Sequence, residues 1–288
     1  MEVLVPEGAD RGLPWHYGDP FHEQRRMEQG CGALVLGSRG VINLVGADRL
    51  IWLNAWVAEP LADAPLDRGV RFTLIGEDGH VSAIIHGADD GESFWGMVDG
   101  DWPLVGFWLQ GVAKQSGQNV AAIPWPSDQR VAAWLGNAHP VRRRVAITAS
   151  LMSQVGRGRL VILPPDQAAA TVADEPVGAW AYEALRIAAR EPRPPQDTDA
   201  KTTPAELSGI PKPTRRLRLV HLDGSAPDPT PPIGTVLLAD AKKKPKEIGR
   251  LGSTAQHYEQ GPIGLALVSA DVPRGTTLKA GQTPATVV

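Results

Sequence analysis

The sequence predicts an α+β fold that ends in a small all-β domain. Up to residue 209, β-rich runs alternate with short segments of helical periodicity, which is typical of α+β layers and not of a doubly wound nucleotide-binding fold. From residue 214 onward, short apolar segments are separated by turn residues such as Asp223-Gly224 and Pro231-Pro232, the spacing of a barrel or sandwich. We therefore expect two domains, residues 1–209 and 214–288, the first built from two intertwined α+β subdomains.

The first hundred residues are expected to form helices and strands in alternation. Pro20 suits the first turn of a helix over 21–29, and Gly30 ends it. Strands are expected over 33–36 and 41–45, followed by a helix over 49–57 that Asp48 would cap. Three β-rich runs then cover 70–75, 81–86 and 93–98. The turn Asp89-Asp90-Gly91 needs no catalytic explanation, because aspartate before glycine favours a tight hairpin.

The remaining elements follow the same reasoning. We expect a helix over 104–111 and strands over 120–123, 142–147 and 160–163. In the C-terminal domain the expected strands are 217–222, 234–239, 247–251, 264–268 and 285–288.

Composition excludes several classes of protein. The 288 residues are 42% hydrophobic and 21% charged with a net charge of −3, an ordinary profile without a bias toward nucleic acid. We interpret the short basic run Arg142–Arg144 as a solvated strand edge and the run Lys242–Lys246 as a solvated hairpin end. A single cysteine excludes an intrachain disulfide, and neither a signal peptide nor a membrane-spanning run is evident. We expect a cytoplasmic monomer that binds neither nucleic acid nor membranes.

The most informative stretch begins at Ala179. Apolar side chains at Trp180, Ala184, Ile187 and Ala188 form one stripe of a helix, whereas Glu183, Arg186 and Arg190 face elsewhere. Pro192 ends the helix. The segment Asp197–Glu206 is too rich in side chains that bond local backbone to continue as a helix. An ordered loop of carboxylates and hydroxyls would form the wall of a polar ligand site; the alternative is a solvated loop.

The same stretch carries a resemblance to a known family. Asp197, Asp199, Thr202, Pro204 and Glu206 match the pattern D-T-D-x-x-T-x-P-x-E, which resembles the glycine-cleavage T-protein (aminomethyltransferase) superfamily and, within it, the folate-binding YgfZ branch. The N-terminal H-Y-G-D-P and S-R-G-V motifs and the C-terminal R-L-x-L-x-x-L-D-G motif are similar to that branch as well.

The chain departs from the family pattern at three points. Ala188 stands where many relatives carry a glutamate that would bind the pterin edge, and Arg190 replaces the usual glycine. The YgfZ motif K-G-C-Y-x-G-Q-E is absent, and the residues Ser208–Pro213 join the loop directly to the last domain.

The resemblance implies a folate-binding protein that assists assembly or maintenance of iron–sulfur enzymes, with tetrahydrofolate or a derivative as cofactor and with activity lost or altered. The residues it assigns to folate binding are Arg39, Trp180, Tyr182, Asp197, Asp199 and Glu206. An aromatic ring would stack on the pterin, a carboxylate would accept from its donor edge, and Arg39 would stack or pair with the glutamate tail. For Arg39 the alternative is a solvated turn arginine.

Two other functions stay open at this stage. The chain could be a tetrahydrofolate-dependent aminomethyltransferase or demethylase, or a degenerate scaffold without catalysis. No complete arrangement of nucleophile and base is legible, so we assign no catalytic residue, and His16 and His22 lack a third ligand for a metal. His257, Tyr258 and Glu259 are expected to have a structural role in the barrel.

Overall fold

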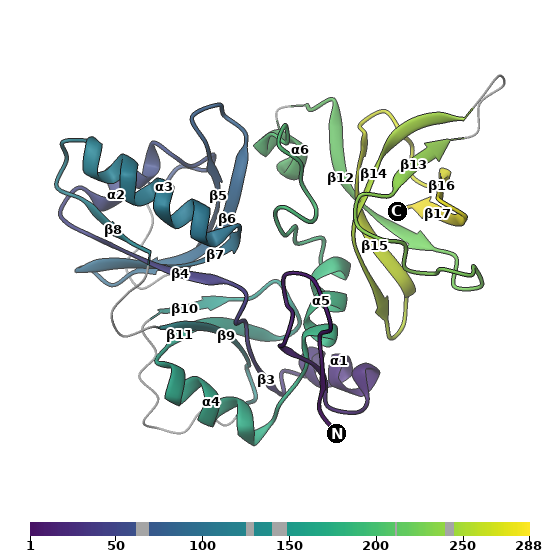
Figure 1. The fold of residues 1–288 in the computed structure, drawn as a ribbon, viewed down its shortest axis with the longest axis horizontal. Helices are drawn as coiled ribbons and strands as arrows, with labels where there is room; N and C mark the ends of the chain where they lie inside the picture. The colour runs from purple at the N-terminus through teal and green to yellow at the C-terminus, as the bar shows by residue number, and fades with distance from the viewer. Residues whose placement is uncertain (62–68, 125–129, 140–148, 211, 240–244) are drawn as a thin grey trace.

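The computed structural model describes residues 1–61, 69–124, 130–139, 149–210, 212–239 and 245–288. Two antiparallel sheets with their helices lie on one side of the molecule and a closed barrel lies on the other, with α5 (Ala179–Ala188) and α6 (Pro204–Ser208) between them (Figure 1). The α+β class and the C-terminal barrel predicted from the sequence are confirmed. The predicted strand 142–147 and residues 242–244 of the second basic run lie outside the described residues.

The first sheet has five strands in the order β5-β6-β7-β4-β8, and every neighbouring pair is antiparallel. Its strands are β4 (Gly40–Val45), β5 (Val70–Ile75), β6 (Val81–Asp89), β7 (Ser93–Gly100) and β8 (Ala121–Ile123). Helices α2 (Arg49–Asn54) and α3 (Trp102–Gln115) cover one face (Figure 1), packing on apolar side chains such as Ile42, Leu44 and Phe72. Alternation along each strand sends every second side chain to this face.

The second sheet has four strands in the order β10-β11-β9-β3. These are β3 (Ala33–Val35), β9 (Val131–Gly136), β10 (Ala149–Met152) and β11 (Gly158–Leu163), with α4 (Pro165–Asp174) on the outer face. The inner face packs on the first sheet, where Val41 and Met97 share one core with Trp134 and Ile162. The two sheets thus form a sandwich with helices outside.

The N-terminal segment packs against helix α5. It contains the hairpin β1 (Val3–Leu4) and β2 (Pro14–His16) and the helix α1 (Pro20–Glu28). Asp19 caps α1, since its side chain accepts hydrogen bonds from the backbone of Phe21 and His22.

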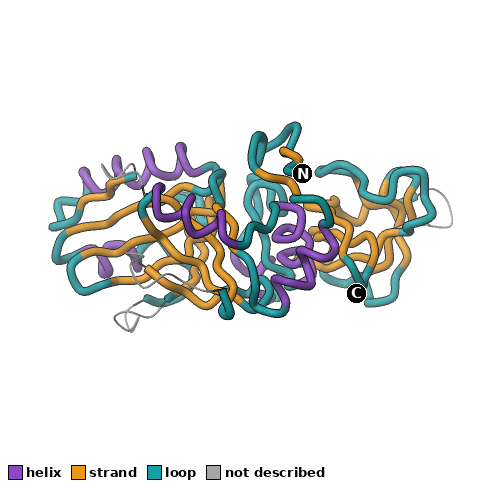
Figure 2. The backbone as a smooth tube through the Cα atoms, turned by 90° about the horizontal axis from the view of Figure 1, so that it is seen from below, coloured by secondary structure: helices purple, strands orange, loops and turns teal. Residues whose placement is uncertain are grey.

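The barrel closes in the order β12-β15-β14-β13-β16-β17. Its strands are β12 (Arg215–Leu222), β13 (Val236–Ala239), β14 (Lys246–His257), β15 (Gly261–Ser269), β16 (Thr277–Ala280) and β17 (Thr283–Val287). Seen from below, one group of helices lies between the barrel strands and the sheets, whereas the other helices lie over the sheets (Figure 2). Within the described chain, no helix is long and apolar enough to cross a membrane.

Helix α5 is buried on nearly all sides. Tyr182 and Leu185 belong to the core of the sheet sandwich, whereas Ala184 and Ile187 pack against the barrel residues Leu219 and Leu265. Burying a leucine or isoleucine side chain stabilises the folded state by about 1.5–3 kcal/mol. This helix therefore joins the two halves of the molecule.

Two local predictions were wrong. Asp48 does not cap α2 with its side chain, because Oδ2 accepts instead from the backbone N–H of Asn119 at 2.8 Å. The polar segment 197–206 does not stay a loop throughout, because α6 begins at Pro204. There the Thr203 side chain accepts from the backbone of Glu206 while the Glu206 side chain accepts from the backbone of Thr203, a capping box.

Candidate functional site

A buried charged network lies where the sheets, α5 and the following loop meet. Its members come from five separate segments and comprise three arginines and four carboxylates: Asp10, Arg39, Asp99, Glu183, Arg186, Arg193 and Asp197. If all are ionised, the network carries one more negative than positive charge. Buried charges are tolerated only when they are paired and hydrogen-bonded, so each contact in the network matters.

Arg39 is bound on every side. Its Nε donates to Asp99 at 2.9 Å, Nη2 donates to Glu183 at 2.8 Å and Nη1 donates to Asp10 at 3.2 Å. The guanidinium also lies 5.4 Å from the centre of the Tyr182 ring. Burial would lower the pKa of Arg39, but Asp99 and Glu183 outweigh it, so the pKa is raised and the group stays charged.

Arg186 and Asp197 tie the network to the barrel. Nη1 of Arg186 donates to Oδ2 of Asp197 at 2.9 Å, and Nε donates to Glu183 at 2.8 Å. The other carboxylate oxygen, Oδ1 of Asp197, accepts from the backbone N–H of Ser253 in β14 at 2.7 Å. One aspartate therefore links α5, the loop after it and the barrel wall.

A cavity of about 290 Å³ opens beside this network, and we call it the central cavity. Asp99 and Arg193 of the network line it, together with Trp102, Asp101 and Gln196. Arg39 and Arg193 both approach Asp99 at Oδ1, and no hydrogen bond from a described residue reaches Oδ2. The excess negative charge therefore adjoins a small, partly aromatic cavity, which is complementary to a planar ligand that presents hydrogen-bond donors.

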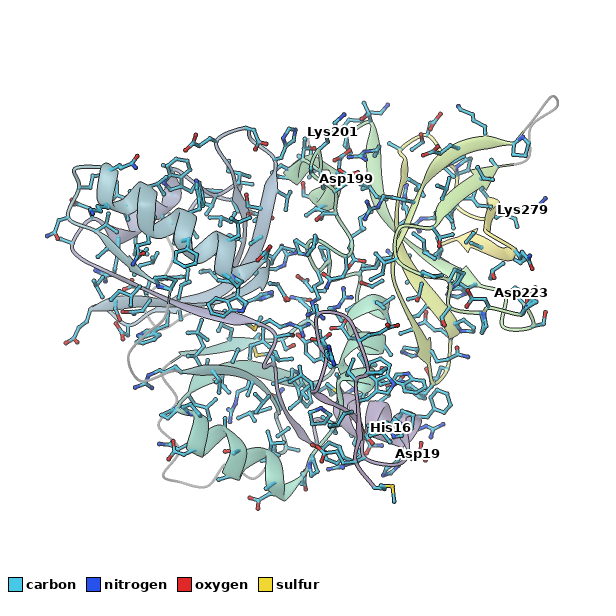
Figure 3. The ribbon with its side chains drawn as sticks, in the orientation of Figure 1. His16, Asp19, Asp199, Lys201, Asp223 and Lys279 are labelled. Atoms are coloured by element: carbon cyan, nitrogen blue, oxygen red, sulfur yellow. The ribbon has the colours of Figure 1, made fainter. Side chains whose placement is uncertain are left out.

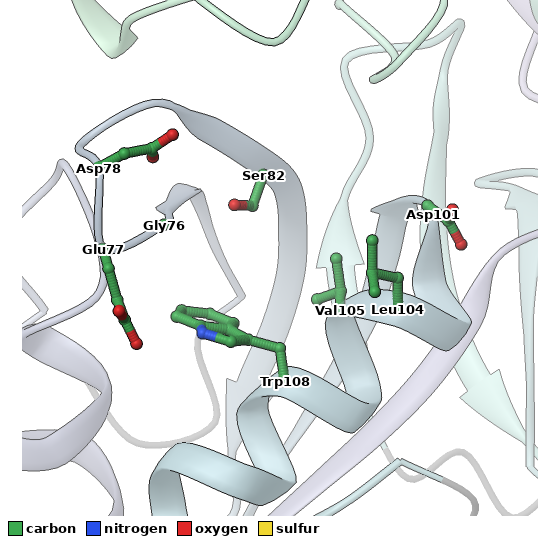
Figure 4. Close-up of a pocket in the computed structure, with 8 residues that line it drawn as sticks. All are labelled: Gly76, Glu77, Asp78, Ser82, Asp101, Leu104, Val105 and Trp108. Carbon is green, nitrogen blue, oxygen red and sulfur yellow. The ribbon is translucent and has the colours of Figure 1, made fainter.

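A larger cavity, of about 510 Å³, lies between the β5–β6 turn and α3. In the close-up, Trp108 projects from α3 beneath the turn that carries Glu77 and Asp78 (Figure 4). Asp101 lines both cavities, but no member of the charged network lines the larger one. We place the candidate site in the central cavity, because binding sites combine an apolar surface with a few convergent polar groups.

The structure brings together only some of the six residues assigned from the sequence. Arg39, Tyr182 and Asp197 gather at the charged network, whereas Asp199 and Glu206 bind Arg215, whose Nη1 lies 2.6 Å from Asp199 and whose Nε lies 2.7 Å from Glu206. The hydrogen bond of Arg215 lowers the pKa of Asp199 below its ordinary value. All six residues are described, and none of them lines the central cavity.

Trp180 lies apart from the other five. Its ring stacks on Trp15 with 5.2 Å between the ring centres and contacts the edge of His16. His16 lies beside α1, at the opposite end of this region from Asp199 near α6 (Figure 3). Folate binding by the six residues stays a prediction, and Arg39, Tyr182 and Asp197 lie at the charged network without lining the cavity.

Sequence reasoning missed most of the network and the cavity lining. Asp10, Asp99 and Arg193 carry no local signature, because only the fold brings them together. A usable signal was present on α5, where Glu183 and Arg186 stand three residues apart on a helix that is otherwise apolar.

Comparison with known proteins gives a likeness at the level of structure. No family model matches the sequence, and no curated protein matches it. Among solved structures, the crystal structure of glycine cleavage system aminomethyltransferase T from Bartonella henselae superposes with a TM-score of 0.77 at 16% identity, covering 100% of this chain and 92% of that chain. The chain has the T-protein fold. At this identity the likeness establishes the fold alone, and function has to be argued from the site.

Proposed function

We propose that this T-protein-like chain binds a folate with its pterin ring in the central cavity, and that it assists the assembly or maintenance of iron–sulfur enzymes in the manner of YgfZ-type proteins. The observation that carries the proposal is Asp99, a buried carboxylate that lines the cavity. Its Oδ1 accepts from Arg39, whereas its Oδ2 accepts no hydrogen bond from a described residue. The iron–sulfur role rests on the sequence resemblance.

The residues around the cavity fit a pterin. A pterin edge presents N–H donors, and a carboxylate is the strongest neutral-pH acceptor for them. Asp99 would accept from this edge, and Trp102 would supply a flat apolar surface. Arg193, whose Nε lies 3.7 Å from Oδ1 of Asp99, would pair with this carboxylate from the side. The volume of about 290 Å³ is at the lower end for small-molecule sites. It suits the bicyclic ring, so the remainder of the folate would extend out of the cavity.

Aminomethyltransferase activity is the second candidate. Its support is the structural neighbour, which is itself an aminomethyltransferase. Bound tetrahydrofolate would supply the one-carbon carrier for either function, while the residues of this chain bind and orient it.

The binding proposal is tested by calorimetric titration of two matched variants with tetrahydrofolate. Asp99→Asn keeps the size of the side chain but removes its negative charge, and we expect affinity to fall about tenfold or more. Asp199→Asn removes a carboxylate that Arg215 already binds outside the cavity, and we expect no change. Equal affinity of both variants, with circular dichroism showing both folded, would contradict the assignment of the cavity.

The iron–sulfur role is tested separately. We expect the wild-type chain with tetrahydrofolate to speed the recovery of an iron–sulfur dehydratase inactivated by oxygen, and Asp99→Asn to do so less. Folate binding without any such recovery would remove the iron–sulfur role and leave the binding site standing. Turnover of a one-carbon donor by the purified chain would establish the aminomethyltransferase alternative instead.

A further inference from the structure

Two arginines of β12 lie on the strand face that is turned to the barrel core further along the strand. Residues directly opposite each other on antiparallel strands share a face, and Arg216 pairs with Val268 while Arg218 pairs with Ala266. Val268 and Ala266 belong to the barrel core, as does Val220, which follows Arg218 on the same face of β12. The first half of β12 thus turns two guanidinium groups to the face that is apolar in the second half.

Two more arginines approach the same end of the barrel. Arg274 lies in the turn before β16, where the backbone N–H of Gly275 donates to Val287, the residue that pairs with Val220. Arg190 follows α5, which packs through Ile187 on Leu219, on the opposite face of β12 from Arg218, and the charge of Arg190 acts on Arg218. We call Arg190, Arg216, Arg218 and Arg274 the arginine cluster.

The arginine cluster lacks an ion-pair partner in the described part of the chain. None of its members forms an ion pair with a described carboxylate, in contrast to Arg215 next to them, which binds two carboxylates. The Nε atoms of Arg216 and Arg218 are buried and make no hydrogen bond to any described group. Burial, followed by the charges of Arg216, Arg274 and Arg190, lowers the pKa of Arg218 from its ordinary value.

The backbone of Arg190 has an unusual conformation for a residue other than glycine. Its φ is 59°, the left-handed region that glycine adopts freely, and no other described non-glycine residue has a positive φ. A left-handed residue after a helix is ordinarily glycine, and a side chain there costs about 1 kcal/mol. Strained residues concentrate at functional sites, and here the strained residue carries a charge that helps to lower the pKa of Arg218.

We propose that the arginine cluster is a binding site for an oxyanion ligand that carries phosphate or several carboxylate groups. Guanidinium groups bind both kinds of oxyanion through paired, charge-assisted hydrogen bonds. A bound oxyanion would offset much of the positive charge of the four arginines and would accept from the Nε donors of Arg216 and Arg218, which have no partner among the described groups. The site is separate from the central cavity, because none of the four arginines lines that cavity.

There is room beside Arg190 for a ligand larger than a single phosphate. Arg190 lines a cavity of about 300 Å³ together with Leu207 and Ser208 of α6. The cavity's two carboxylates are already engaged, Glu191 with Arg71 and Glu59 with the backbone N–H and hydroxyl of Thr73. Arg216 reaches toward the same helix, since its Cζ lies 4.0 Å from the place of a Cβ on Gly209, the residue that ends α6.

The test is calorimetric titration of the full chain with inorganic pyrophosphate and with citrate, against sodium chloride of equal ionic strength. We expect saturable binding of at least one oxyanion and a loss of affinity of about tenfold or more in Arg216→Gln/Arg218→Gln. The matched control, Arg11→Gln/Arg157→Gln, removes the same charge from two exposed arginines without ion pairs to described residues, and it should bind as the wild type does. Tighter binding of pyrophosphate would identify a phosphate ligand, and tighter binding of citrate a carboxylate ligand.

A second variant keeps the test independent of folding defects in the barrel. Arg190→Gly places glycine in a conformation that glycine prefers, so the chain should fold at least as well while binding the oxyanion more weakly than Arg190→Lys. Binding of neither anion above the chloride control would overturn the proposal, as would equal affinity of the double variant and its control. Because no folate is used, failure here leaves the folate proposal unaffected.

Discussion

Glu183 is the residue on which the buried charged network depends most. It accepts from Arg39 at 2.8 Å, from Arg186 at 2.8 Å and from Arg193 at 3.3 Å. Burial would raise the pKa of Glu183, but the three arginines outweigh it and hold the pKa well below its ordinary value of 4.5. Glu183→Gln removes the charged acceptor that three buried arginines share, although the other three carboxylates still balance their charge. We therefore expect it to destabilise the fold by about 1–3 kcal/mol at neutral pH, the cost of weakened hydrogen bonds to buried charged groups.

The lowered pKa of Glu183 makes the stability of the fold depend on pH. Below pH 4.5 the unfolded chain takes up a proton at Glu183 that the folded chain does not, so the stability that Glu183 contributes is complete above this pH and is lost as pH falls. Urea denaturation between pH 7 and pH 3 should show a shallower decline below pH 4.5 for Glu183→Gln than for the wild type. The exposed control Glu7→Gln should follow the wild type. Parallel curves for all three proteins would contradict the role given to Glu183.

At Arg190 we expect a substitution that stabilises the fold. Because its backbone is left-handed, we expect Arg190→Gly to raise the free energy of unfolding by about 0.5–1 kcal/mol, measured by urea denaturation. Arg157→Gly is the control, since Arg157 is exposed and has no positive φ, and it should be neutral or destabilising. A destabilised Arg190→Gly would mean that the arginine side chain contributes more to the fold than its backbone strain removes.

At the scale of elements, the loop between α5 and α6 is clamped to the barrel by close backbone approach. A Cβ on Gly252 of β14 would lie 2.4 Å from Oδ1 of Asp197 and 3.0 Å from the Asp197 backbone. Only glycine therefore permits the hydrogen bond from Ser253 to Asp197.

We expect Gly252→Ala to destabilise the protein by about 1–3 kcal/mol, because it separates Asp197 from its backbone donor and strains the buried network. Gly224→Ala, in the same barrel, is the control, since its Cβ would meet only Pro262 at an ordinary 3.4 Å. Thermal unfolding followed by circular dichroism compares the two variants. Equal melting temperatures would show that the loop does not need this close contact.

At the scale of the whole molecule, the sequence predicts helices and strands better than it predicts the tertiary contacts between them. The strands β5, β6 and β7 and the helix α5 follow from apolar runs and periodicity, which depend on neighbouring residues. Helix α6 was missed although Thr203 and Glu206 have capping-box spacing, because the polar composition of the segment outweighed that signal. The charged network could not be predicted, since Asp10, Arg39 and Asp99 are far apart in the chain and only the tertiary fold joins them.

The candidate site was likewise predicted only in its local part, the loop after α5, and not in the residues that the tertiary fold brings to it. The loop that resembles the T-protein pattern lies next to the site, but its Asp199 and Glu206 hold Arg215 and α6 in place, while the cavity is lined by Asp99 and Trp102 from the first sheet and α3. The division of the chain at residues 209 and 214 stays a prediction.

The measurement that tests the central claim most directly is calorimetric titration of the wild-type chain with tetrahydrofolate. We expect saturable binding with one site and micromolar affinity, about −8 kcal/mol, the free energy of a small ligand held by one flat surface and a few hydrogen bonds. A folded sample that releases or absorbs no heat of binding, and whose melting temperature tetrahydrofolate does not raise, would contradict the assignment of a folate site to the central cavity.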